Sequence, residues 1–76
     1  QITVFPNSSP DGFYYIESSS IENIHWSVYT MQGFLMASDN GSDSRLIDLI
    51  HCPKGIYVAN ISIGLQKYAI KLIKIN

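Results

Sequence analysis

The side chains best suited to catalysis or metal binding are few in this 76-residue chain, which has two histidines and one cysteine. His51 and Cys52 are neighbours in sequence, so the histidine is not held across a pocket as the base that a nucleophilic thiol needs. A single cysteine can form neither an internal disulfide nor a cysteine zinc site. We interpret Cys52 as a half-buried turn residue and His25, within a strand-like segment, as a surface or interface residue.

The acidic residues do not form a recognisable site either. Asp39, Asp43 and Asp48 lack the ordered ligand spacing and the distal glutamate of a calcium loop. Nothing in the arrangement of Glu17 and Glu22 with these aspartates favours paired-carboxylate glycoside hydrolysis. The sequence also has no G-x-S-x-G, H-E-x-x-H or phosphate-binding glycine motif. It therefore predicts a protein that is not an enzyme, with no metal site and no cofactor.

The aromatic side chains offer a different chemistry, because a row of them on a sheet face can stack on sugar rings. The same residues can instead fill a small sandwich core, with the tyrosine hydroxyls reaching backbone partners. We favour the core interpretation and keep a small β-sandwich carbohydrate-binding module as the alternative function. The residues concerned are Trp26, Tyr14, Tyr15, Tyr29, Tyr57 and Tyr68.

Composition narrows the class of protein further. Only 14% of the residues are charged, against about 25% in an average soluble protein, and the formal net charge is -1. The five Lys and Arg residues are spread out, which argues against nucleic-acid binding. No apolar run approaches the length of about 20 residues that a membrane helix needs, so stable membrane insertion is not expected. The length predicts one domain, residues 1–76, and the low charge suits a module that is held against a neighbour. Gln1 is followed at once by strand-like sequence, which predicts a piece excised from a larger protein.

Alternation of apolar and polar residues predicts strands. In residues 24–30, Ile24, Trp26 and Val28 share one face, which makes Trp26 the expected centre of the core. Similar segments cover residues 2–5, 13–17, 34–38, 45–49, 55–62 and 66–75, with a loop at 7–12, a three-residue hairpin connection at 31–33 and turn glycines at Gly12, Gly33, Gly41 and Gly64. This spacing predicts an all-β, seven-stranded, Ig-like antiparallel sandwich.

The last predicted strand is irregular. Tyr68, Ile70 and Leu72 share one face, whereas Ile73 and Ile75 continue the apolar set on the other. A bulge near Leu72, or burial of both faces, would explain this change. Either explanation predicts a covered, docked C-terminal strand that carries Lys67, Lys71 and Lys74.

The ordered set of motifs resembles the type A C-terminal sorting domain of the type IX (Por) secretion system of Bacteroidetes-type bacteria. Val4-Phe5-Pro6-Asn7 with Gly12-Phe13-Tyr14 is similar to the opening element of that family, and residues 28–33 resemble its Val-Tyr-x-x-x-Gly hairpin. Residues 46–49 followed by 53–58 resemble its most specific stretch, and residues 66–74 its basic-apolar last strand. The chain departs from the family pattern at Ser8 in the first loop and at Phe34 and Leu65 in the two hairpins.

The resemblance implies a secretion signal without chemistry of its own. Such a domain directs an upstream cargo domain from the periplasm across the outer membrane, through contacts with the translocon, shuttle and sortase components. A sortase then commonly removes it and anchors the cargo to surface lipopolysaccharide, or releases it, so the expected location is the periplasm in transit to the cell surface or the medium.

We expect translocon recognition by seven residues of the last third: Pro53, Lys54, Gly55, Tyr57, Lys71, Lys74 and Asn76. A turn role explains Gly55 equally well, and protection of an edge strand against aggregation explains Lys71 and Lys74. An exposed edge also allows two copies to pair in a crystal without biological meaning.

Overall fold

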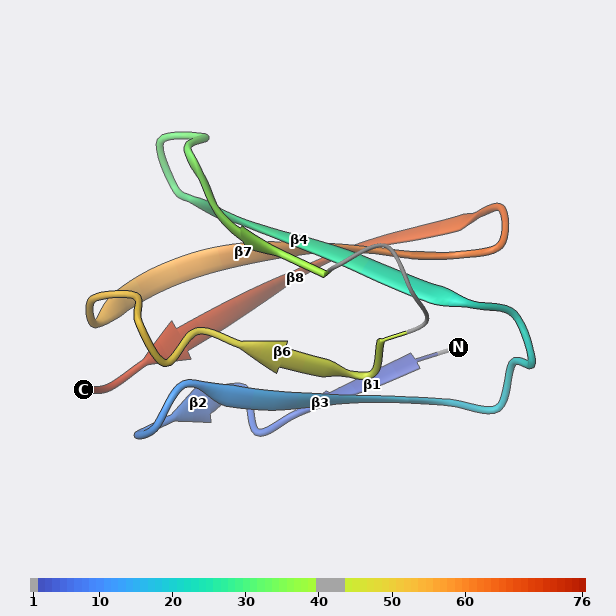
Figure 1. Ribbon diagram of the computed structural model, residues 1–76, viewed down its shortest axis with the longest axis horizontal. Coiled ribbons are helices and arrows are strands. Elements are labelled where there is room, and N and C mark those ends of the chain that lie inside the picture. Colours follow the sequence, from blue (N-terminus) through green and yellow to red (C-terminus); the bar gives the residue numbers. More distant parts are fainter. Residues whose placement is uncertain (1, 40–43) are drawn as a thin grey trace.

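The computed structural model describes residues 2–39 and 44–76, and all of its regular elements are strands (Figure 1). They form a three-stranded sheet, in the order β1-β3-β6, and a five-stranded sheet, in the order β2-β8-β7-β4-β5. The predicted all-β class is confirmed, with eight strands rather than seven. The strands are β1 Ile2–Phe5, β2 Ser8–Ser9, β3 Phe13–Ser18, β4 Ile24–Thr30, β5 Leu35–Ser38, β6 Leu46–Asp48, β7 Gly55–Ile63 and β8 Gln66–Lys74.

The core lies between the two sheets and follows from the period of two. Along β4 the burial pattern alternates, and Ile24, Trp26 and Val28 point inward as predicted. On β7 the inward residues begin with Tyr57 and end with Ile63. From the opposite sheet Tyr14 and Ile47 close the same core. Full burial of one such apolar side chain stabilises the fold by about 1.5–3 kcal/mol.

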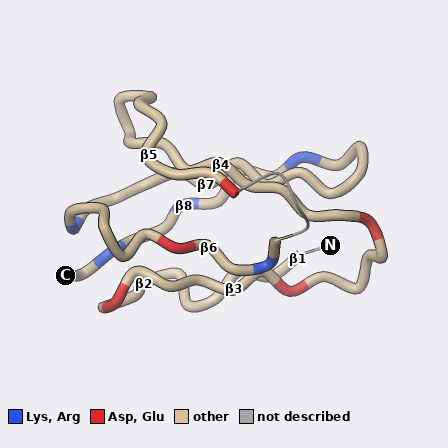
Figure 2. The backbone as a smooth tube through the Cα atoms, viewed as in Figure 1, with Lys and Arg blue, Asp and Glu red and all other residues tan. Residues whose placement is uncertain are grey.

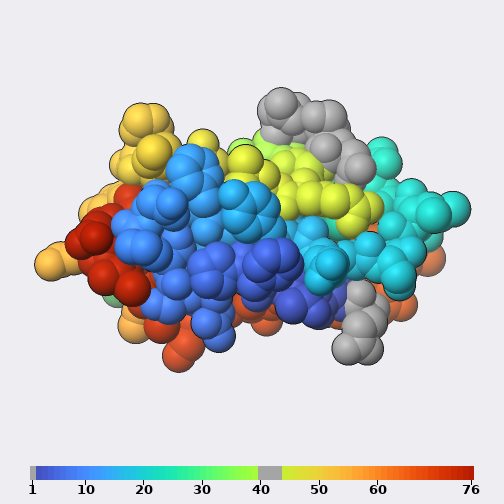
Figure 3. All heavy atoms as spheres, turned by 90° about the horizontal axis from the view of Figure 1, so that it is seen from below, coloured from blue at the N-terminus to red at the C-terminus, as the bar shows by residue number. Residues whose placement is uncertain are grey.

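The additional strand, β2, arises because the N-terminal segment changes sheets. β1 pairs antiparallel with β3, and two residues later β2 pairs parallel with β8. Ile73 N–H donates to Asn7 O at 3.0 Å, and Ile75 N–H donates to Ser9 O at 2.9 Å. The N-terminal residues therefore lie against the C-terminal ones (Figure 3). The predicted loop at 7–12 is wrong at Ser8–Ser9, because this short strand is formed by its distant partner rather than by local β propensity.

The predicted irregularity in the last strand is also wrong. The register between β7 and β8 runs without a shift from Gly55↔Lys74 to Ile63↔Gln66. Leu72 and Lys74 point inward, whereas Ile73 and Ile75 remain 36% and 51% exposed. The inward set does continue beyond Leu72, but a lysine occupies the next position, which apolar patterning cannot reveal. The register shift in this sheet lies instead between Val28 and Tyr29, where β4 pairs with β5.

Three of the four predicted turn glycines have positive φ, two of them in hairpin turns. Gly33 and Gly64 have φ of 96° and 58°, and Gly12 has φ of 87°. The β4–β5 connection is one residue longer than the predicted 31–33, because Phe34 O accepts the Thr30 N–H bond and β5 begins at Leu35. The predicted turn at Gly41 lies outside the described residues. Within residues 2–39 and 44–76, no helix has the length and apolarity needed to cross a membrane.

Candidate recognition site

The loop that crosses from β6 to β7 places Pro53 and Lys54 on the surface, while Gly55 is half-buried and Tyr57 is buried. Tyr57 Oη donates a hydrogen bond to the Pro53 carbonyl four residues upstream. Burial raises the pKa of the Tyr57 phenol above its ordinary value of 10.0, and Cys52 adds to this shift. This hydrogen bond, from a tyrosine near the start of a strand to the preceding loop, resembles the tyrosine corner of Ig-type sandwiches. It fixes the loop that presents Pro53 and Lys54.

The three lysines of β8 lie in two different environments. Lys67 and Lys71 are exposed, whereas Lys74 is only 6% exposed. Lys74 Nζ donates to Ile50 O at 3.0 Å and also to Cys52 O. The ammonium therefore holds the crossing loop against the end of β8.

The end of β8 is also tied to the opposite sheet. Tyr14 Oη, from β3, donates to Ile73 O at 2.6 Å. Burial raises the pKa of the Tyr14 phenol above 10.0, with smaller contributions from Tyr57 and Asp11. Beyond this point Ile75 and Asn76 are exposed. The predicted recognition residues thus comprise an exposed set and a buried set: Pro53, Lys54, Lys71 and Asn76 are exposed, Gly55 is half-buried, and Tyr57 and Lys74 are buried.

Charge is distributed unequally between the sheets. The strands of the five-stranded sheet contain Lys67, Lys71 and Lys74 and no Asp or Glu (Figure 2). The carboxylates of the described residues lie on the other sheet and in the connecting segments. An anionic partner would therefore be attracted to β8 more than to the opposite sheet.

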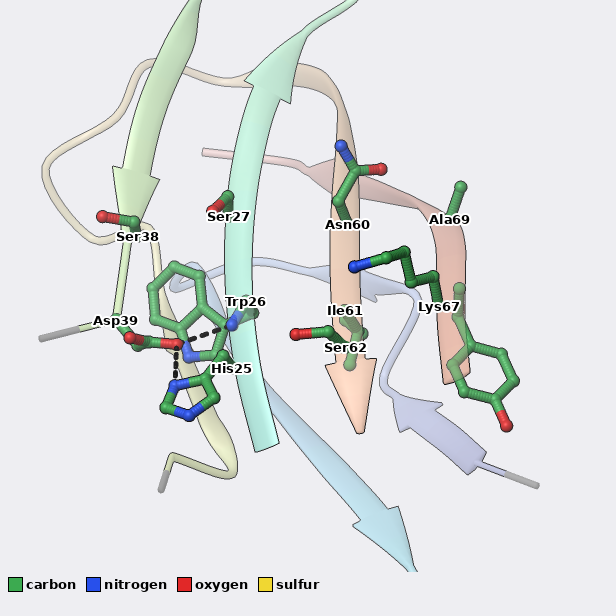
Figure 4. Close-up of a pocket in the computed structure, with 11 residues that line it drawn as sticks. His25, Trp26, Ser27, Ser38, Asp39, Asn60, Ile61, Ser62, Lys67 and Ala69 are labelled. Carbon is green, nitrogen blue, oxygen red and sulfur yellow. Dashed lines mark hydrogen bonds and ion pairs between the residues drawn. The ribbon is translucent and has the colours of Figure 1, made fainter. Parts of the chain in front are cut away.

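A hollow of about 670 Å³ lies on the outer face of the five-stranded sheet (Figure 4). At one side His25 Nδ1 lies 3.3 Å from Asp39 Oδ2, and the same oxygen accepts the Trp26 N–H bond at 2.6 Å. Sequence analysis missed this hollow, although its signal was present as small outward residues at matching positions of adjacent strands. These form a row in register across the sheet: Ser38, Ser27, Asn60 and Ala69.

Nowhere in residues 2–39 and 44–76 do three His, Cys, Asp or Glu side chains come together as a metal site. Trp26 is 6% exposed, and its Nε1 donates to Ser44 Oγ at 3.1 Å. Its ring belongs to the core and is not available to stack on a sugar.

Comparison with protein-family models matches residues 3–76 to the family described as secretion system C-terminal sorting domain. No curated protein matches the chain. The family match runs from Thr3 in β1 to the end of the chain, and so includes the crossing loop and β8. A sorting-signal family is not a family of enzymes. The chain belongs to the C-terminal sorting domains of the type IX secretion system.

Proposed function

We propose that this domain directs an attached upstream cargo protein through the periplasm and across the outer membrane, by contacts of its crossing loop and last strand with the type IX translocon. The family match over residues 3–76 carries this proposal. In the same proposal a shuttle and a sortase act after the translocon. The sortase removes the domain and joins the cargo to surface lipopolysaccharide or releases it.

Burial refines the proposed roles of the recognition residues. Pro53, Lys54 and Lys71 are exposed and can touch a partner. Tyr57 and Lys74 donate their hydrogen bonds to carbonyls of residues 50–53 and can act only by positioning that loop. We therefore propose that the exposed residues contact the translocon and that the buried ones hold them in place.

The proposed fold is Ig-like. In such domains two sheets pack through a buried tryptophan on a central strand, with a tyrosine corner at the entrance to another strand. Trp26 on β4 and Tyr57 on β7 match these two features, and β4 and β7 are neighbours. The N-terminal strand is divided between the sheets as β1 and β2, which accounts for eight strands where seven were predicted.

The test is an export assay with the 76-residue chain fused behind a periplasmic reporter, in a host that has this secretion system. We expect wild type and the control Glu17→Gln, on the opposite sheet, to reach the cell surface. We expect the double variant Lys54→Gln, Lys71→Gln to accumulate in the periplasm with unchanged unfolding free energy. Retention of the wild-type fusion in the periplasm would contradict the sorting function. Normal export of the double variant would contradict only the residue assignment.

A further inference from the structure

One edge of the five-stranded sheet is only partly covered. β2 pairs with β8 at Ile73 and Lys74 and extends no further. Because Ile73 N–H points to β2, alternate residues toward the start of β8 direct their backbone groups the same way, away from β7. Among the described residues no strand pairs with this edge at Lys67, Ala69 and Lys71. About 20 Å of strand edge, residues 66–71, is thus open to another strand.

The side chains on this edge differ between its two faces. Outward, Lys67 and Lys71 flank Ala69, whose small side chain leaves access to Asn60 and the hollow (Figure 4). No strand of this sheet carries a carboxylate. Asp39, which follows β5 and lines the hollow together with Lys67, is engaged by His25 and by the Trp26 N–H.

Inward, the same edge is apolar. Tyr68 and Ile70 are half-buried against the core. On the opposite sheet Ile2 and Val4 of β1 are also half-buried. β1 is the edge strand of its sheet, and only Pro6 and Asn7 separate it from β2, so both edges lie on the same side of the sandwich. This side of the core is left partly open between β1 and β8.

We infer that the edge of β8 at residues 66–71 binds an extended peptide segment of another protein, in which acidic and apolar side chains alternate. Backbone hydrogen bonds to Lys67, Ala69 and Lys71 supply affinity and register. Outward acidic side chains of the peptide pair with Lys67 and Lys71, and inward apolar ones cover Tyr68 and Ile70. Because the period of a strand is two, only an alternating sequence satisfies both faces.

This inference names a class of partner for the last strand and rests on the proposed function for its biological setting. Its test needs no secretion. A fluorescent peptide of about eight residues that alternates Glu and Val is titrated with the purified 76-residue chain, and anisotropy is recorded at low and high salt. We expect saturable binding that weakens with salt. Absence of binding would overturn the inference.

Two variants test the two sources of recognition. Ala69→Pro removes one donor of the open edge without removing a bond to β7, and a proline is tolerated on an edge strand. Lys67→Glu with Lys71→Glu reverses the charge of the outward face, and the control Glu17→Lys reverses an exposed charge on the opposite sheet. We expect each of the first two changes to weaken peptide binding about tenfold, with the control within about twofold of wild type.

Amide hydrogen exchange of the wild-type chain gives a second readout that does not depend on variants. The peptide should protect the amides of Lys67, Ala69 and Lys71 and leave those of the three-stranded sheet unchanged. Equal binding of a peptide with paired Glu-Glu-Val-Val residues would overturn the inference. Binding of an anionic polysaccharide that depends on the lysines but not on Ala69→Pro would also overturn it, because that pattern indicates simple charge attraction.

Discussion

At the scale of single residues, Lys71 and Lys74 look alike in the sequence and differ in the fold. Lys71 projects from the outer face of β8, whereas the Lys74 ammonium is held by the Ile50 and Cys52 carbonyls. A buried lysine in this position acts through its stem as well as its charge, because the stem packs while the ammonium finds acceptors.

This difference leads to a prediction for the pair of variants Lys74→Met and Lys71→Met. The first keeps an apolar stem but removes the donor to two carbonyls, so we expect the unfolding free energy to fall by about 1–3 kcal/mol. The second should change it by less than about 0.5 kcal/mol. Urea unfolding followed by Trp26 fluorescence measures both. Equal costs would mean that the two carbonyl bonds contribute nothing beyond those of a surface lysine.

Turn glycines allow a second prediction at this scale. Gly12 and Gly33 both have positive φ, but a Cβ on Gly12 would lie 3.0 Å from the backbone of Leu49, whereas a Cβ on Gly33 meets no atom within 4 Å. Both alanine variants carry the left-handed penalty of about 1–2 kcal/mol. We expect Gly12→Ala to lower the unfolding free energy by at least about 1 kcal/mol more than Gly33→Ala does. Thermal or urea unfolding decides this, and equal costs would show that the Leu49 backbone moves away freely.

The burial of some side chains could be predicted from the sequence, whereas that of others could not. Trp26 could be predicted as a core residue because its neighbours at i±2, Ile24 and Val28, are apolar. Lys74 could not, since its burial depends on carbonyls in a loop 22 residues away in sequence. The hydrogen bond from Tyr57 to the Pro53 carbonyl joins residues only four apart, so this contact could have been predicted from the sequence.

At the scale of elements, β8 is the strand on which the fold and the proposed recognition both depend. It pairs with β7 along its whole length and joins β2 at its end. Removal of residues 71–76 would delete the buried Leu72 and Lys74 together with the partner of β2. Removal of 75–76 would delete only exposed residues and the Ile75 to Ser9 hydrogen bond.

We therefore expect the two truncations to behave differently. Deletion of 71–76 should cost more than about 3 kcal/mol, because it removes a buried leucine and several strand bonds. Deletion of 75–76 should lower the unfolding free energy by less than about 1.5 kcal/mol. Circular dichroism and urea unfolding of both truncated chains test this. If the chain without residues 71–76 were still stably folded, the end of β8 would be dispensable for the fold. A failure of that truncated chain in an export assay would then report lost recognition alone.

The strands themselves were largely predictable, and their pairing was not. β4 coincides with the predicted residues 24–30 because its alternation is unbroken and turn residues bound it. β2 was missed because Ser8 and Ser9 have no apolar face, and their partners Ile73 and Lys74 lie at the other end of the chain. The β4–β5 register shift also depends on tertiary pairing rather than on local sequence.

At the scale of the whole molecule, two buried tyrosines connect the sheets and the crossing loop. Tyr14 reaches from β3 to Ile73 of β8, and Tyr57 reaches from β7 to Pro53. Each phenol donates its proton to a carbonyl, so ionisation would remove the donor and place a negative charge against that oxygen. Burial correspondingly raises the pKa of both phenols in the folded protein above 10.0.

Stability should therefore fall in alkaline solution. Because the folded state holds these protons more tightly than the unfolded state, their contribution is complete below pH 10.0 and is lost as pH rises through the folded pKa values. Urea unfolding at intervals between about pH 8 and 11.5 should show this decline. Tyr57→Phe lacks the hydroxyl that bonds Pro53, so its unfolding free energy below pH 10.0 should be lower by about 1 kcal/mol. Because phenylalanine cannot ionise, the unfolding free energy of this variant should fall less steeply as pH rises. If wild type and Tyr57→Phe had the same slope, the Tyr57 proton would not be linked to folding.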